Sequence, residues 1–69
     1  MNQKEAQQLA LQIQSGAPYL KTSLEYVTVV GEGSWGVKLV VKSTGESPGV
    51  MEDAGEWDSI KQYLLPPNP

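Results

Sequence analysis

The stretch VVGEGSWGVKLVV, residues 29–41, decides the fold. It places apolar and largely β-branched residues on both sides of three glycines, at positions 31, 33 and 36. β-branched and aromatic residues favour strands, and glycine accepts the backbone angles of tight hairpin turns. The stretch therefore predicts two antiparallel strands joined by a glycine-rich turn.

Side-chain alternation predicts the two faces of this hairpin, because successive residues of a strand point to opposite sides. A loop with an even number of residues, Glu32-Gly33 or Gly33-Ser34, brings two apolar sets to one face: Leu24, Tyr26, Thr28 and Val30, and Trp35, Val37, Leu39 and Val41. An odd loop would pair Val27 and Val29 with Val37 and Leu39 and leave Tyr26 on the polar side, so the even register is favoured. Val27, Val29 and Val40 then lie on the second face, where they are covered by a helix or contact a second subunit.

A helix is predicted before the hairpin. Residues 6, 9, 10 and 13 are apolar at helical spacing, and glutamine-rich positions cover the other side. Asn2 and Glu5 have the spacing of a capping box at its start, while Gly16 and Pro18 supply its end.

A second helix is predicted after the hairpin, starting at Asp53 and ending before Pro66, with an apolar stripe of Trp57, Ile60 and Leu64. Residues 43–55 connect it to the hairpin, and Val50-Met51 is a candidate third strand. The prediction is one small α+β domain over residues 1–69, in the order α-β-β-(β)-α. Residues 66–69 are expected to fray at the end of the chain.

Composition excludes several classes of function. The chain has no cysteine and no histidine, which argues against zinc or iron–sulfur ligation, thiol chemistry and imidazole catalysis. Five lysines, no arginine and eight carboxylates argue against a nucleic-acid partner, since such domains carry a basic stripe. No apolar run approaches the roughly 20 residues that span a bilayer, and the N-terminus lacks signal-peptide character. We therefore expect no membrane partner and a cytoplasmic location.

The glycine spacing also matches two phosphate-binding motifs. The dinucleotide-binding motif requires its glycines to open a helix, and a strand pattern follows them here. The segment Gly31-Glu32-Gly33-Ser34-Trp35-Gly36 resembles the glycine-rich loop of protein kinases, over about a dozen residues. That family has a valine where this chain has Lys38, and its catalytic segments have no counterpart here. Kinase activity is excluded, which leaves an anion-binding turn at Gly31, Gly33, Ser34 and Gly36 as a weaker alternative.

Two further features suggest contact with a partner. Five of the eight carboxylates fall between residues 46 and 58, and no lysine lies between Lys42 and Lys61. Glu52, Asp53 and Glu56 could form an acidic docking surface, or Asp53 and Glu56 could simply stabilise a helix start. Trp57 is expected in the core, whereas Trp35 beside the turn is either a core residue or a binding hot spot.

The sequence therefore favours a non-catalytic interaction module that binds another protein or itself. Its candidate surface is Val27, Val29, Val40, Trp35, Glu52, Asp53 and Glu56. No residue is assigned a catalytic, cofactor-binding or metal-binding role. The alternative is a small-ligand or anion-binding domain that uses the Gly31–Gly36 turn.

Overall fold

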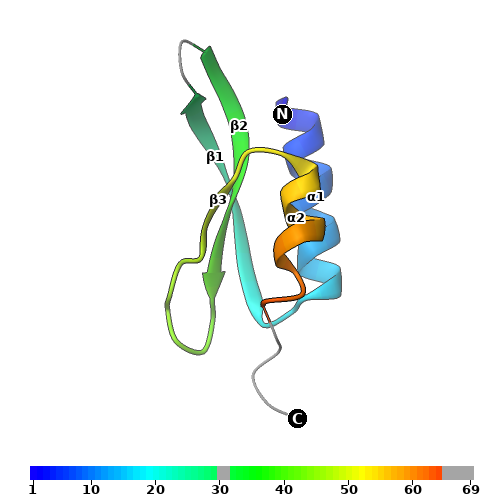
Figure 1. The fold of residues 1–69 in the computed structure, drawn as a ribbon, viewed down its shortest axis with the longest axis vertical. Coiled ribbons are helices and arrows are strands. Elements are labelled where there is room, and N and C mark those ends of the chain that lie inside the picture. The colour runs from blue at the N-terminus through cyan, green and yellow to red at the C-terminus, as the bar shows by residue number, and fades with distance from the viewer. Residues whose placement is uncertain (30–31, 65–69) are drawn as a thin grey trace.

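A computed structural model describes residues 1–29 and 32–64 of the chain (Figure 1). The elements are α1 (Gln3–Gly16), β1 (Leu20–Val29), β2 (Glu32–Val41), β3 (Gly49–Met51) and α2 (Ala54–Ile60). The three strands form an antiparallel sheet in the order β1-β2-β3. The predicted α+β class, the element order and the candidate third strand are confirmed.

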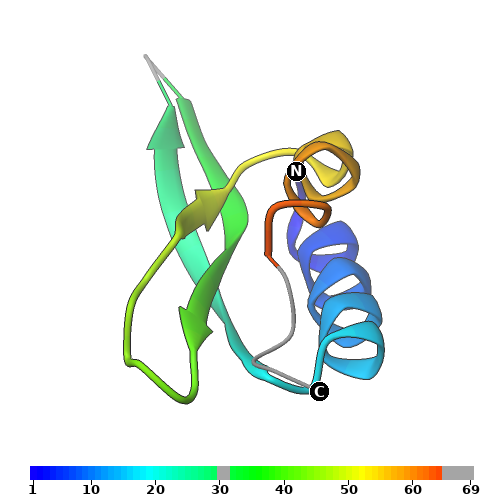
Figure 2. The same cartoon turned by 60° about the horizontal axis from the view of Figure 1, so that its bottom comes forward.

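Both helices pack on one face of this sheet (Figure 2). The core between them is formed by buried side chains from all five elements and from the turn after α1: Ala6, Leu9, Ile13, Ala17, Leu20, Val37, Leu39, Met51 and Trp57. Trp57 is 7% exposed, so its predicted role as a core residue is confirmed. The helices leave the opposite face of the sheet without a covering layer among the described residues.

The strand register confirms the predicted faces but not the predicted turn. Tyr26 pairs with Trp35, as an even-numbered loop requires. However, Thr28 pairs with Gly33 and Val29 with Glu32, so the prediction that Glu32-Gly33 or Gly33-Ser34 forms the turn is wrong. The longer ladder satisfies more backbone groups, and the Tyr26 ring covers Gly33, where a Cβ would meet its hydroxyl. Residues 30–31, between the strands, lie outside the described residues.

The N-terminal helix starts with the predicted capping box. The Asn2 side chain accepts from the Glu5 backbone N–H (2.8 Å), and the Glu5 carboxylate accepts from the Asn2 backbone N–H (3.1 Å). Ahead of the cap, the Met1 carbonyl accepts from the Trp35 N–H (2.9 Å), and the Met1 amine donates to the carbonyl of Glu52 (3.2 Å). These bonds place the start of α1 beside β2, next to the end of β3.

The second helix is shorter than predicted. It ends at Ile60, and residues 61–64 form turns instead of the expected last helical turn. Leu64 remains half-buried against the core, and its carbonyl accepts a hydrogen bond from the Tyr19 hydroxyl. Because α2 ends at Ile60, residues 61–64 can turn back and pack against the core beside the start of β1.

Candidate functional site

The free edge of β1 is the feature of this fold with the clearest binding chemistry. β1 is one of the two outer strands, and within residues 1–29 and 32–64 only its inner edge is paired with another strand, β2. In an antiparallel ladder the backbone groups of alternate residues point toward the partner strand and away from it. The Val27 carbonyl points toward β2, where it accepts from the Ser34 hydroxyl (3.4 Å). The backbone N–H and C=O groups of Leu24, Tyr26 and Thr28 therefore point outward.

The first part of this edge is already occupied by α1. The Gln14 side-chain amide nitrogen donates to the Leu20 carbonyl (2.6 Å), and its oxygen accepts from the Thr22 backbone N–H (3.3 Å). The Thr22 hydroxyl lies 3.4 Å from the Ala10 carbonyl, which it reaches as a donor. One glutamine thus takes the place of a neighbouring strand at Leu20–Thr22 and leaves Leu24–Thr28 open.

A shallow hollow of about 360 Å³ adjoins the open part of the edge. It lies between α1 and β1 and is lined by Gln7, Ala10, Leu11 and Leu24. Leu11 is 70% exposed and Tyr26, two residues beyond Leu24, is 59% exposed. The outward backbone N–H and C=O groups, which an added strand could hydrogen-bond, thus lie next to apolar side chains that are partly open to solvent.

The uncovered second face carries two of the predicted surface residues, but in separate places. Val27 and Val40 are both half-buried there. Val27 pairs with Ser34 and Val40 pairs with Lys21, so they lie six residues, or about 20 Å, apart along the sheet. Lys38 stands between them on this face. The side chain of Val29 lies outside what the structure describes.

The apolar part of this face is packed around Gly36. A Cβ on Gly36 would meet the side chains of Val27 and Val50 at 2.8 and 2.9 Å, so these two valines close over the glycine from the flanking strands. The sequence did not place Val50 on this surface, because its neighbours depend on how β3 pairs with β2.

Trp35 lies on the helix-covered face and is half-buried against the core. Its ring packs edge-on against Tyr26, with the centroids 5.5 Å apart and the planes at 85°. The tryptophan therefore supports the aromatic residue on the β1 edge, while its role as a hot spot stays a prediction.

The carboxylates of Asp53 and Glu56 accept hydrogen bonds from backbone N–H groups at the start of α2. The Asp53 carboxylate accepts from the Gly55 N–H (2.7 Å), and the Glu56 carboxylate accepts from the Glu52 N–H (3.3 Å). All three acidic side chains are exposed, so they still present negative charge to solvent. In the part of the chain that the structure describes, no group of three or more acidic side chains could hold a metal ion.

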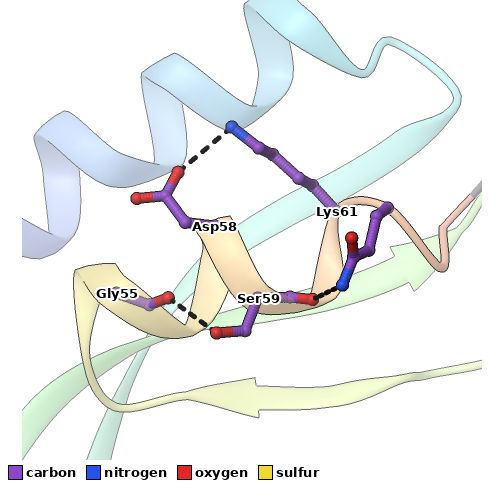
Figure 3. A network of polar contacts seen from close by, with 5 residues as sticks. Gly55, Asp58, Ser59 and Lys61 are labelled. Carbon is purple, nitrogen blue, oxygen red and sulfur yellow. Dashed lines mark hydrogen bonds and ion pairs between the residues drawn. The ribbon is translucent and has the colours of Figure 1, made fainter.

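Local polar contacts join residues of α2 and of the turn that follows it (Figure 3). Lys61 forms an ion pair with Asp58 at 3.1 Å, and the Ser59 hydroxyl donates to the Gly55 carbonyl (3.4 Å). Both partners of the ion pair are largely exposed, so it contributes little to stability.

The glycine-rich segment does not have the geometry expected of an anion-binding turn. Gly33, Ser34 and Gly36 belong to β2 and pair with β1, and Gly31 lies outside the described residues. The backbone N–H groups of Ser34 and Gly36 face β1, because their partners Val27 and Glu25 face β2. The prediction that these residues form a turn is wrong, and ligand binding by them stays untested.

No family model, curated protein or solved structure matches the chain. Neither helix in residues 1–29 and 32–64 has the length and apolar character of a membrane-spanning segment.

Sequence reasoning missed the residues that define the β1 edge. Leu24 and Tyr26 were assigned to the apolar face, but nothing in the sequence told which strand lies outermost. Leu11 and Gln14 were the weak signal in the sequence for a second contact surface on the first helix. Leu11 is apolar but lies outside the apolar stripe, and Gln14 is polar but lies one turn after Ala10 of that stripe.

Proposed function

We propose that this chain is a non-catalytic interaction module that binds another protein, or a second copy of itself, through the free edge of β1. The observation that supports this proposal is the run of outward-facing backbone groups at Leu24, Tyr26 and Thr28. Unpaired strand edges bind extended chains by adding a strand to the sheet. A cytoplasmic site of action belongs to the same proposal, since a chain without cysteine fits a reducing compartment.

The neighbouring surfaces support this use of the edge. Folded proteins usually block exposed edges with charges, prolines, bulges or a covering element. Among the described residues, Gln14 blocks the edge at Leu20–Thr22. The side chains beyond it on the helix-covered face are Leu24, Tyr26 and Thr28. An edge that is blocked in one half and open beside an apolar hollow is suited to a specific partner.

A matched pair of variants tests the proposal. Tyr26→Pro removes the central outward N–H without removing a hydrogen bond to β2, and proline is tolerated at such positions of edge strands. Tyr26→Val loses the same aromatic ring but keeps the N–H. The wild-type chain and both variants are immobilised and exposed to an extract of cells that produce this chain. The retained proteins are identified by mass spectrometry.

The expected result is another protein, or a second copy of the chain, that wild type and Tyr26→Val retain and Tyr26→Pro loses. Circular dichroism of both variants checks that the sheet is intact. Retention of the same proteins by all three chains would contradict a role for the edge in binding.

A further inference from the structure

The open edge and the hollow beside it together restrict the chemistry of the partner. Resting on the function proposed above, we propose that the partner is an extended segment of a different protein. This segment adds to β1 as a fourth strand, with a large apolar side chain beside Leu24 and a basic side chain beside Glu25.

The backbone of β1 requires an extended partner. The outward groups of Leu24, Tyr26 and Thr28 recur every second residue, about 6.6–6.8 Å apart. Another strand presents donors and acceptors at that repeat, whereas a helix uses its own backbone groups internally. Gln14 already illustrates the match, because its single amide group bonds Leu20 and Thr22 as a strand would.

The hollow requires an apolar side chain on the helix-facing side of the added strand. The residue of that strand opposite Leu24 points toward α1, into the space lined by Gln7, Ala10 and Leu11. The space is about 360 Å³, and Leu11 on its rim is 70% exposed. A leucine-sized or larger side chain would enter this hollow and cover Leu11, so apolar area leaves water on both sides of the contact.

The other side of the added strand meets Glu25. This carboxylate is half-buried on the uncovered face, and the described residues hold no ion pair that involves it. The chain has a net charge of −3. A basic residue next to the apolar one, on the opposite side of the added strand, would pair with Glu25, and the overall field favours its approach.

A second copy of the chain fits this edge poorly. Three antiparallel registers place a residue of Leu24–Thr28 opposite Leu24. Pairing Leu24 with its own copy requires Thr22 opposite Tyr26, but the Thr22 N–H is held by Gln14. Pairing Leu24 with Tyr26 sets Glu25 opposite the same carboxylate of the other copy, and like charges directly opposite are destabilising.

The third register pairs Leu24 with Thr28 of the copy. It sets a small polar side chain into the apolar hollow and leaves Glu25 opposite Val27. Two chains of net charge −3 also repel each other. A basic and apolar segment of another protein therefore fits the edge better than a second copy does.

The test uses a seven-residue peptide in which lysine and leucine alternate, with both ends blocked. The full chain, labelled with ¹⁵N, is titrated with this peptide, and amide shifts are followed by NMR. We expect the largest shifts at Leu24, Tyr26 and Thr28, and loss of binding in Tyr26→Pro but not in Tyr26→Val. Two control peptides replace leucine by threonine or lysine by glutamate, and each should bind at least about tenfold more weakly.

Two further variants test the individual contacts. Leu11→Ser removes the apolar rim of the hollow and Glu25→Gln removes the charge, and each should weaken binding of the lysine–leucine peptide several-fold. Gln12→Ser is the control for Leu11→Ser, because Gln12 is an exposed neighbour on α1 outside the hollow. It should leave the affinity unchanged.

Three results would overturn the inference. The first is no amide shift at millimolar peptide. The second is that wild type binds all three peptides with equal affinity, or that Tyr26→Pro binds the lysine–leucine peptide as tightly as wild type does. The third is a dimer of the chain alone, seen by sedimentation and abolished by Tyr26→Pro, which would make a second copy the partner. If the peptide fails while extract proteins still depend on the Tyr26 N–H, the partner chemistry is wrong and the proposed function stands.

Discussion

Replacing Gly36 by alanine tests how closely the three strands pack. Gly36 is buried in β2, and a Cβ at this position would lie 2.7 Å from the Met51 carbonyl oxygen. It would also lie 2.8 Å from a methyl of Val27 and 2.9 Å from a methyl of Val50. Uncrowded contacts between carbon atoms need about 3.5–4.0 Å, so all three neighbours would have to move.

The cost follows from what can move. The valine side chains can rotate, but the Met51 carbonyl belongs to the pair of Met51 with Val37 that holds β3 on β2. Overpacking of this kind costs about 1–3 kcal/mol. Alanine loses less conformational entropy than glycine on folding, which returns roughly 0.5–1 kcal/mol. At the middle of both ranges, the expected net loss is about 1 kcal/mol.

Gly16→Ala is the matched control, because it makes the same chemical change at a position with open space. No heavy atom lies within 4 Å of a Cβ at Gly16, and its φ is not in the left-handed region. This variant should gain up to about 1 kcal/mol, mainly through the unfolded state. The two substitutions should thus shift stability in opposite directions.

Urea unfolding followed by tryptophan fluorescence measures both effects. With an m-value near 1 kcal/mol/M for a chain this small, the midpoint of Gly36→Ala should fall by about 1 M. The midpoint of Gly16→Ala should stay the same or rise. A midpoint for Gly36→Ala that equals or exceeds the wild-type value would refute the close packing of Val27, Val50 and β3 around this glycine.

Three further predictions concern the contacts that hold the helices and the chain end. Gln14→Ala removes both bonds to the β1 backbone and the bond from the Thr22 hydroxyl. It should cost about 1–2 kcal/mol of unfolding free energy in urea titrations, while Gln12→Ala, at an exposed site, should change little. Asn2→Ala breaks the capping box and should cost about 1 kcal/mol, measured in the same way; an unchanged midpoint would mean that the cap does not contribute. Tyr19→Phe removes the bond to the Leu64 carbonyl, so hydrogen exchange should accelerate in residues 61–64 and remain unchanged in β2.

The order of elements was predictable because local patterns specify it. The helical spacing of residues 6–13 and the alternation along residues 35–41 each have one period, and the period selects helix or strand. The capping box at Asn2 and Glu5 fixed the start of α1 to the residue. The burial of Trp57 followed from its place in the apolar stripe of α2.

The position of the hairpin turn was not predictable in the same way. Glycines at 31, 33 and 36 offered several turns of the same parity, and each would have kept the apolar residues on one face. The choice depended on how Tyr26 packs across Gly33 and on how Val27 and Val50 close over Gly36. Those contacts join residues from different strands, so no local pattern contains them.

The sequence by itself determined the order and type of the helices and strands, the parity of the hairpin and the residues available for a core, because these depend on short-range periodicity and on hydrophobicity. Only the tertiary structure decided which strand is outermost, that both helices share one face, and that Gln14 covers half of the β1 edge. An edge strand and a paired strand have the same alternation and differ only in whether another chain segment supplies partners for their backbone groups. The candidate binding site depends on that difference.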